Sequence, residues 1–543
     1  MTSLKPTSTE TLTEASNLSV AASARSTSRL ATLFAIAALT ATLGGCGGGG
    51  GDGGSTPFPP PPPPPPPAAD ASPQVCAPTN PYRGDALDPT TVGTLANEKA
   101  WLHSYMSDAY LWTSEMPSVD AGNALFSDTS HVYASLDNYF MAQLTPNHTA
   151  SGKLRDQFSF TMPTKEWNDL INSGSTSGYG VQWHADSWNS TPRGIRIAYV
   201  EPGSPASTAG LLRGDLLVTA DGVSADSMTN SGIDTLNAAL FPSDNGQTHS
   251  FTVSRTGSGT LSKSVTSATV ITDPVPSTMV IDNAGSKVGY VVFNDHIASS
   301  EQKLIDAVNT LKAAAVTDLV LDLRYNGGGY LYLASELAYM IAGSSRTSGK
   351  VFEQLQYNSK RSDETNSDDA KTPFFSSSCI LDANFNCSNQ QPLPTLNLSR
   401  VTVITTNGTC SASEAIINGL RGVDVDVRVI GGTTCGKPYG FTAKDNCGIS
   451  YFPIEFKGIN AKGYGDYADG FTATCPASDD YDHAMGDTDE GMLNAALYNL
   501  QHNACSLAAA QTARRSALGL SPYAQPRLLR GPERESRIVI PRR

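Results

Sequence analysis

The stretch VTVITTNGTCSASE (residues 401–414) runs from an apolar strand through a polar turn into a helix that begins at Ser411. The same alternation recurs along the second half of the chain, with strands at 289–293, 319–323 and 427–430 and helices at 302–315, 330–341 and 411–420. Alternation of this kind predicts a parallel or mixed sheet with crossover helices. We therefore expect an α/β core over residues 280–500, in which residues 342–399 form an inserted loop or small cap.

The serine at the corner between strand and helix has two interpretations. A serine at the first position of such a helix exposes its Oγ on a tight turn, and the N–H groups of that helix end face any oxyanion formed there. Ser411 or Ser413 can equally cap the helix, with Glu414 completing a capping box. The corner alone leaves both open.

A lysine follows the next strand, in GGTTCGK (residues 431–437). Neighbouring strands of a wound sheet can bring Lys437 beside Ser411. An ordinary lysine has a pKa of about 10.4 and becomes a base only when burial lowers that value. Apolar Tyr439 and Phe441 could exclude water there, although a lone lysine in a loop is more often solvated.

A triple glycine at 327–329 follows the strand at 319–323. It suits a flexible turn, and it also suits a backbone donor for an oxyanion, because no side chain obstructs the approach. The pattern matches neither of the glycine motifs that bind phosphate groups.

The first half of the chain changes texture twice. Aromatic and aliphatic residues at helical spacing between 96 and 144 predict a helical subdomain, assigned to residues 76–165, with this stripe in its core. Short strands with Gly-Asp and Asp-Gly turns predict a β domain at residues 178–275.

In this order, the segments resemble the carboxyl-terminal processing, or tail-specific, serine protease family. DLRYNGGG (322–329) is similar to its oxyanion turn, SASE (411–414) to its nucleophile motif and Gly436-Lys437 to its base, while residues 178–222 resemble its PDZ domain. The resemblance covers roughly residues 95–500. It implies a multidomain α+β fold with an N-terminal helical subdomain, a PDZ-like β domain and an α/β catalytic core of the crotonase/ClpP-like ββα type.

The resemblance also implies roles for individual residues. Ser411 would attack the scissile carbonyl and Lys437 would accept its proton. The N–H groups of Ala412 and of Gly328 or Gly329 would hold the oxyanion.

In the PDZ-like domain, the loop Tyr179-Gly180-Val181 would receive the C-terminal carboxylate of a polypeptide substrate. No cofactor or metal enters this chemistry.

One position departs from the family pattern and keeps alternatives open. Phe441 stands where many members have a glutamine four residues after the lysine, so either Thr442 or Tyr439 orients the amine, or the dyad works unaided. A Ser-His pair using His296 or His483 is another arrangement. The chain could also be a catalytically inactive PDZ/protease-like peptide-binding lipoprotein, or a crotonase-like hydrolase that shares the ββα architecture.

The N-terminus has the features of an export signal. Basic residues precede an apolar run of 14 residues at 30–43, which is short for a membrane span. LGGC (43–46) resembles a lipobox, so we expect a signal peptide at 1–45, acylation of Cys46, and a bacterial lipoprotein on the outer membrane facing the periplasm or cell surface. An ordinary signal peptide with a chance cysteine is the alternative. A Gly/Pro linker at 46–75, with nine prolines at 59–67, would hold the protein away from that surface.

Composition sets further limits. The net charge of −14 argues against a nucleic-acid partner, and the only expected membrane contact is the N-terminal lipid. Nine cysteines leave eight besides Cys46, an even number that suggests disulfides in an exported chain. Cys379–Cys387 and Cys435–Cys447, the pairs closest in sequence, are the expected ones, and the spacings do not suggest zinc. The segment 501–543, whose last 30 residues carry eight arginines, is predicted to be a disordered tail.

Overall fold

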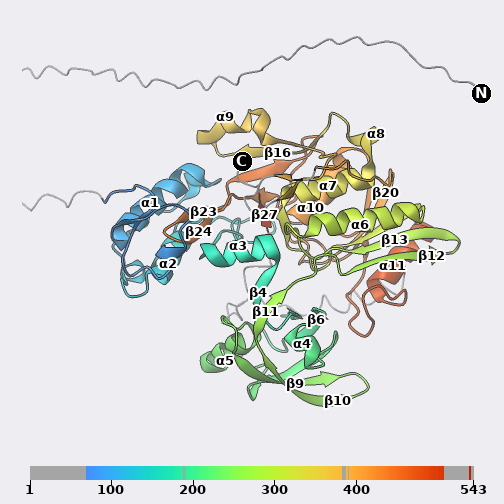
Figure 1. The fold of residues 1–543 in the computed structure, drawn as a ribbon, viewed down its shortest axis with the longest axis horizontal. Helices are drawn as coiled ribbons and strands as arrows, with labels where there is room; N and C mark the ends of the chain where they lie inside the picture. The colour runs from blue at the N-terminus through green and yellow to red at the C-terminus, as the bar shows by residue number, and fades with distance from the viewer. Residues whose placement is uncertain (1–68, 188–189, 382–386, 389, 507–536, 540–543) are drawn as a thin grey trace, which may run out of the picture. The chain divides into compact units, whose positions relative to one another are not determined.

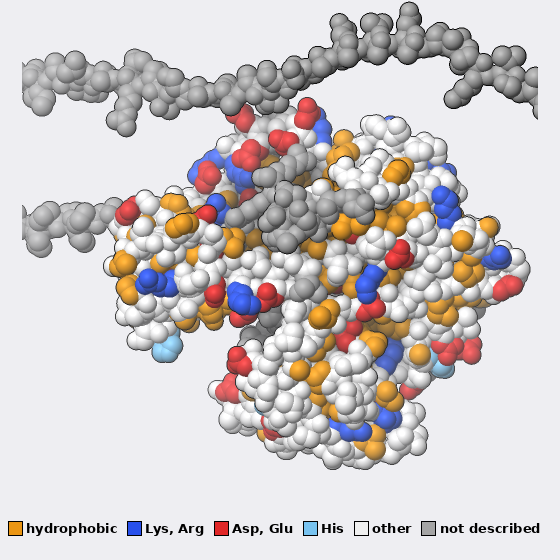
Figure 2. All heavy atoms as spheres, viewed as in Figure 1, with side chains coloured by type: hydrophobic (Ala, Val, Ile, Leu, Met, Phe, Trp, Pro, Cys, Tyr) orange, Lys and Arg blue, Asp and Glu red, His pale blue; other side chains and the backbone are white. Residues whose placement is uncertain are grey.

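The computed structural model describes residues 69–187, 190–381, 387–388, 390–506 and 537–539. The expected signal peptide, the lipidation site Cys46 and the proline run lie outside these residues. All described residues belong to one compact unit that begins at Pro67. Within them, no helix combines the length and the apolar character needed to cross a membrane. Figure 2 shows acidic and basic side chains interspersed over one face of the molecule, without a continuous basic surface there.

The N-terminal region contains two main helices, α1 (Leu95–Ala109) and α2 (Val132–Ala142). Thr94 caps α1 and forms a capping box with Asn97, which satisfies backbone donors of the first turn. The predicted aromatic stripe is buried in one cluster, as expected: Trp101, Leu102, Tyr110, Leu136, Phe140. Short elements complete this part of the chain: β1 (Val75–Cys76), β2 (Thr91–Val92), β3 (Phe160–Pro163) and α3 (Thr164–Ser173).

The predicted β domain is present, with a sheet in the order β10-β9-β7-β6-β5 and β8 paired to β7. Its elements are β5 (Val181–His184), β6 (Arg196–Val200), α4 (Pro205–Thr208), β7 (Leu216–Ala220), β8 (Val223–Ser224), α5 (Asn230–Leu240), β9 (Thr248–Arg255) and β10 (Gly259–Thr266). A separate hydrophobic core fills it, including Trp183, Leu236 and Phe251. Figure 1 shows β4 (Ser175–Gly178) and β11 (Ala268–Ile271) side by side, where the chain enters and leaves this domain.

The central sheet of the second half has the order β12-β13-β14-β20-β21-β26. Its strands are β12 (Ser277–Asn283), β13 (Ser286–Val292), β14 (Asp318–Asp322), β20 (Arg400–Thr405), β21 (Asp426–Gly431) and β26 (Cys475–Pro476). All neighbours are parallel except β12 and β13. This is the mixed sheet predicted from the alternation of strands and helices.

Helices cover both faces of this sheet. Leu321, Val403 and Val429 belong to one hydrophobic cluster, together with residues of α6 (Ser300–Ala313), α7 (Leu331–Ala342) and α10 (Ala412–Gly422). Val320, Ile404 and Ile430 belong to another cluster with residues of α11 (Gly491–His502). Successive strand residues therefore enter opposite cores, as the pleat of a strand requires.

Two smaller sheets adjoin the core. One has the order β17-β16-β25-β22 and the other β23-β24-β3. Their strands are β16 (Val351–Tyr357), β17 (Lys371–Pro373), β22 (Tyr439–Gly440), β23 (Lys444–Asn446), β24 (Ile449–Phe452) and β25 (Phe456–Ile459). The expectation that residues 342–399 form only a loop or cap is therefore corrected, because β16 and β17 are strands of a shared sheet. The same segment also holds α8 (Ser344–Thr347), α9 (Ser362–Thr365), β18 (Ile380–Leu381) and β19 (Cys387–Ser388).

Four disulfides join the described cysteines. The predicted pair Cys379–Cys387 is confirmed. The predicted pair Cys435–Cys447 is wrong: the bonds are Cys410–Cys435 and Cys76–Cys447, with Cys475–Cys505 as the fourth. Cys410 and Cys435 follow the adjacent parallel strands β20 and β21, so they meet at one sheet edge although 25 residues separate them.

The segment 501–543 contains ordered elements. Helix α11 extends to His502, and the Cys475–Cys505 disulfide fixes the chain just beyond it. Strand β27 (Arg537–Val539) pairs with β15 (Gly328–Tyr330). The prediction of a disordered tail therefore does not describe these residues.

Candidate active site

Ser411 lies at the corner between β20 and α10, as the sequence predicted. Its backbone has φ 58° and ψ −116°, a conformation that a residue with a Cβ adopts only when its surroundings impose it. The side chain is fully buried, and its Oγ has no hydrogen-bond partner among the described residues. A strained corner of this kind is typical of a nucleophilic serine.

Glu414 fixes the backbone on both sides of the site. Its Oε2 accepts hydrogen bonds from the N–H of Ser411 at 3.0 Å and from the N–H of Lys437 at 2.8 Å. Its Oε1 accepts from the N–H of Gly436 at 3.0 Å and from the hydroxyl of Thr434 at 2.5 Å. Burial raises the pKa of Glu414, and these donors oppose the shift because they stabilise the carboxylate. Since one oxygen bonds both N–H groups, the backbones of Ser411 and Lys437 are adjacent.

The disulfide Cys410–Cys435 reinforces this arrangement, because it joins the residue before Ser411 to the segment before Lys437. Within the described part of the chain, Cys410, Glu414 and Cys435 lie close enough together to suggest a metal site. Both sulfurs belong to the disulfide, however, and both carboxylate oxygens already accept hydrogen bonds. These three residues are therefore unsuited to binding a metal ion.

The Lys437 side chain is fully buried between aromatic rings. Its Nζ lies 5.2 Å from the ring centre of Phe158 and 4.7 Å from that of Phe441. Gly436 permits this path of the chain, since its φ is 91° and an added Cβ would lie 2.2 Å from the carbonyl oxygen of Ala468. The apolar surroundings expected for Lys437 are present.

Phe441 is part of an aromatic cluster rather than a polar support for the lysine. Its ring packs against Phe160, Trp167 and Phe452. The two candidates for the missing glutamine have structural contacts of their own. The Thr442 N–H donates to Glu455, and Tyr439 packs against the rings of Trp112 and Phe158.

The glycine loop is held by His296 and Asn326. The N–H of Gly328 donates to the Asn326 side-chain oxygen at 2.9 Å, and its carbonyl accepts from the His296 N–H at 3.2 Å. An added Cβ at Gly329 would lie 2.3 Å from the His296 carbonyl oxygen, so glycine is required there. Because the Gly328 N–H is engaged, Gly329 is the better oxyanion donor of the predicted pair.

The two histidines have other surroundings. His296 is fully buried, its Nδ1 lies 2.9 Å from the Asn326 side-chain oxygen, and burial lowers its pKa from 6.5 to about 3. The Nδ1 of His483 contacts the Asp480 carboxylate at 2.7 Å, and that hydrogen bond raises the pKa of His483. Within the described residues neither ring is bonded to the Ser411 hydroxyl.

In the β domain, the loop Tyr179-Gly180-Val181 leads into β5, at the edge of the sheet. The carbonyl of Tyr179 accepts from the Ala206 N–H at 3.0 Å and that of Gly180 accepts from the Glu201 N–H at 2.8 Å. The loop is thus fixed beside a sheet edge, the setting in which a peptide can add as a further strand.

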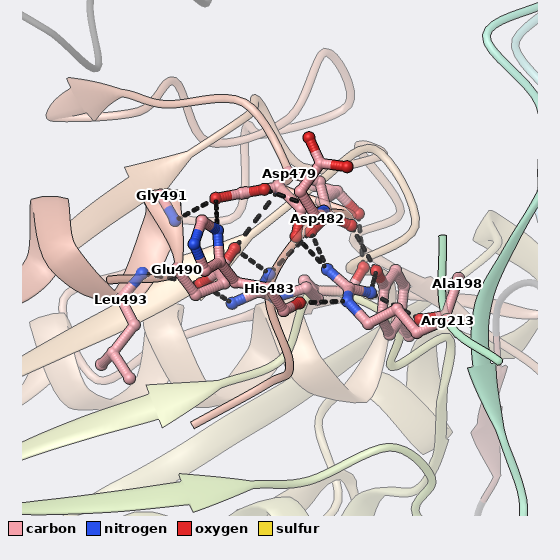
Figure 3. Close-up of polar contacts among 12 residues, drawn as sticks. Ala198, Arg213, Asp479, Asp482, His483, Glu490, Gly491 and Leu493 are labelled. Atoms are coloured by element: carbon pink, nitrogen blue, oxygen red, sulfur yellow. Dashed lines mark hydrogen bonds and ion pairs between the residues drawn. The ribbon is translucent and has the colours of Figure 1, made fainter. Parts of the chain in front are cut away.

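A polar network joins this domain to the core (Figure 3). Arg213 donates to the Asp479 carboxylate at 2.6 Å and to the Tyr325 hydroxyl at 2.7 Å. Arg324 donates to the same Asp479 oxygen at 2.7 Å and also to Glu490 at 2.8 Å. Burial alone would raise the pKa of Asp479, but Arg324 and Arg213 hold it well below its usual range.

The sequence analysis did not identify Arg213, Arg324 or Asp479 as part of the site. A charged residue directly after the apolar strand 319–323 is the available signal for Arg324, and its partners come from segments far away in the sequence. The sequence assigned Glu414 only a capping role, whereas the structure shows that it also bonds the lysine segment.

Comparisons with known proteins agree with this fold. Residues 287–444 match peptidase family S41, and residues 196–231 match a PDZ domain. A carboxyl-terminal-processing protease of Picosynechococcus sp. (strain ATCC 27264 / PCC 7002 / PR-6) is 32% identical over 34% of this chain and 44% of its own length. The carboxy-terminal processing protease CtpA of Bacillus subtilis (strain 168) is 22% identical over 60% of this chain and 63% of its own. This chain therefore spans less than two thirds of the length of either relative.

A solved structure extends the comparison to most of the chain. A putative S41 protease from Bacteroides fragilis NCTC 9343 is 25% identical, with a TM-score of 0.55, and the match covers 74% of this chain and 97% of that one. The expected fold class, a multidomain protein with a PDZ domain and an α/β protease core, is confirmed.

Proposed function

Because this chain carries a PDZ domain and a peptidase family S41 core, we propose that it is a serine endopeptidase of the carboxyl-terminal processing type. Its substrates are exported polypeptides, and Ser411 and Lys437 form its catalytic dyad. The observation that carries the proposal is the shared oxygen of Glu414, which accepts the N–H groups of both residues.

In the proposed mechanism the Ser411 Oγ attacks the scissile carbonyl carbon while the Lys437 Nζ takes the serine proton. The N–H of Ala412 belongs to the first turn of α10, whose donors lack partners within the helix, and with the Gly329 N–H it stabilises the oxyanion. The proton passes to the leaving amine, and water then hydrolyses the acyl-enzyme. Lys437 acts as a base only when neutral, and its complete burial favours that form since desolvation disfavours a charged amine.

The PDZ domain supplies substrate capture in this proposal. The C-terminal carboxylate of a polypeptide binds the backbone of Tyr179-Gly180-Val181, and the peptide extends the sheet at the edge of β5. Acylation of Cys46 would hold the enzyme at a membrane surface, facing exported substrates.

Replacing the nucleophile tests the proposal. Ser411→Ala should lower the cleavage of an unfolded protein substrate by at least about 10³-fold and abolish labelling by a fluorophosphonate. Ser413→Ala is the matched control on the same helix. Its hydroxyl donates to the Asn326 carbonyl at 3.1 Å, so the variant should lose about 1 kcal/mol of stability and keep its label.

Two results would contradict the proposal. One is undiminished cleavage by Ser411→Ala. The other is a folded wild-type protein that binds peptides yet takes no label, which would support the inactive peptide-binding alternative that Phe441 suggests.

A further inference from the structure

The C-terminal segment of the chain forms a strand on the glycine loop. Strand β27 (Arg537–Val539) pairs in parallel with β15, with Gly328 opposite Arg537, Gly329 opposite Ile538 and Tyr330 opposite Val539. These residues are more than 200 positions apart in the sequence, so a short strand here is a docked segment rather than a local turn. The segment thus uses the backbone of the residues to which the proposed mechanism assigns the oxyanion.

The other flank of this strand is the lysine side of the site. Strand β27 also packs beside β22 (Tyr439–Gly440), which begins two residues after Lys437. Helix α10, which begins next to Ser411, packs beside β15. The strand therefore lies between the two segments that carry the proposed oxyanion donor and the proposed base (Figure 1).

We propose that this position is the substrate-binding cleft and that the C-terminal segment of the chain occupies it as an intramolecular competitor of substrates. The inference rests on the proposed function for the identity of the cleft. A polypeptide substrate would bind in the same way, as an extended strand parallel to β15 with its main chain hydrogen-bonded to the sheet edge.

Charge favours this occupant over an unrelated peptide. Residues 507–543 carry eight arginines against two glutamates, whereas the whole chain has a net charge of −14. The body that receives the segment is therefore strongly acidic, and Asp466, which pairs with Lys457 opposite Tyr439 of β22, is 84% exposed. A basic segment is attracted to such a surface, and salt weakens that attraction.

A covalently attached competitor acts at high local concentration. A flexible tether gives an effective concentration on the order of 1 mM, so a segment that binds with a dissociation constant of about 0.1 mM would raise the apparent KM about tenfold. The value of kcat would stay the same, since saturating substrate displaces the segment.

The first experiment measures binding without catalysis. A fluorescein-labelled peptide of residues 531–543 is titrated into Ser411→Ala protein that ends at residue 530, and binding is followed by fluorescence anisotropy. The expected result is saturable binding that weakens between 50 and about 500 mM salt. A peptide with Ile538→Pro should bind at least about tenfold more weakly, because proline has no N–H and interrupts a ladder.

The second experiment measures competition within the full chain. Ile538→Pro in the full-length protein should lower the KM for a peptide substrate several-fold and leave kcat unchanged. Ser516→Pro, the same kind of change in the tail but outside the paired strand, is the matched control and should keep the wild-type KM. Addition of the 531–543 peptide to the protein that ends at residue 530 should restore the higher KM.

The inference is overturned if the peptide does not bind and Ile538→Pro leaves KM at the wild-type value. It is also overturned if intact mass shows that wild-type protein removes these residues while Ser411→Ala keeps them, since the segment would then be a substrate and not a resident competitor. Because the binding experiment needs no catalysis, its outcome separates this inference from a failure of the proposed protease activity.

Discussion

At the scale of single residues, the site depends on one strained serine and one carboxylate that bonds both halves of the dyad. The backbone conformation of Ser411 costs on the order of 1–3 kcal/mol and persists only where the surroundings impose it. The N–H bond to Glu414, the disulfide at Cys410 and the packing of α10 supply those surroundings. The cap and the nucleophile, two readings that the sequence left open for Ser411, are thus compatible, because Glu414 caps the helix while the serine oxygen remains unbonded among the described residues.

Lys437→Met separates the chemistry of the lysine from its packing. Methionine has a similar length and fits between the Phe158 and Phe441 rings without a buried charge, so the unfolding temperature should stay close to that of the wild type. Loss of the general base should lower kcat about 10²–10⁴-fold. Lys457→Met, at a lysine paired with an exposed aspartate, is the control and should keep full activity. Retention of more than about a tenth of the wild-type kcat by Lys437→Met would assign the base to another group.

At the scale of secondary structure elements, local patterns predicted what local interactions decide. The strands and helices of the core follow the alternation in the sequence, and each predicted strand appears within a few residues of its observed bounds. Strand β16 was missed because its apolar partner strand lies about a hundred residues away, with Gln354 opposite Ile459. The Cys410–Cys435 bond was missed for a related reason, since it follows from the adjacency of β20 and β21 and not from the spacing of cysteines.

Glu353 on β16 gives a pH dependence that can be tested. It is almost fully buried, its Oε1 has no hydrogen-bond partner among the described residues, and burial raises its pKa from 4.5 to about 8. The folded state therefore holds this proton more tightly than the unfolded state, so stability should fall as pH rises from about 4.5 to about 8 and then level off. The loss has an upper limit of roughly 4 kcal/mol, since one pKa unit corresponds to about 1.4 kcal/mol.

Chemical denaturation of Glu353→Gln between pH 5 and pH 9 measures this contribution. The variant should show a smaller fall in the free energy of unfolding than the wild type and should be the more stable protein at pH 9. Glu364→Gln is the control, because Glu364 is about half exposed and pairs with Arg361 at the surface. Parallel pH profiles of wild type and Glu353→Gln would mean that Glu353 is not protonated in the folded protein.

At the scale of the whole molecule, the PDZ domain and the glycine loop are connected by buried charges. Arg213 belongs to the PDZ domain, while Arg324 and Tyr325 directly precede the triple glycine. Asp479 bonds both arginines and the Tyr325 hydroxyl, so a shift of the PDZ domain acts on the strand end that leads to Gly328. This connection could not be read from the sequence, because Asp479 follows the core strands by many residues and gains its meaning only where three segments meet.

A double-mutant cycle on Arg213→Met and Asp479→Asn tests whether this contact transmits an effect to catalysis. Each single change leaves a buried charged or polar group without its partner and should destabilise the protein by roughly 3 kcal/mol. The double variant should lose less than the sum, with a coupling of about 1–3 kcal/mol, since removal of both groups avoids an unpaired charge. If the contact also positions the glycine loop, kcat should fall in both single variants measured below their unfolding temperatures, while Arg255→Met, which breaks the Arg255–Asp215 pair within the PDZ domain, should destabilise that domain and leave kcat unchanged. Additive losses of stability together with a wild-type kcat would show that the two arginines hold the domains together without any influence on the site.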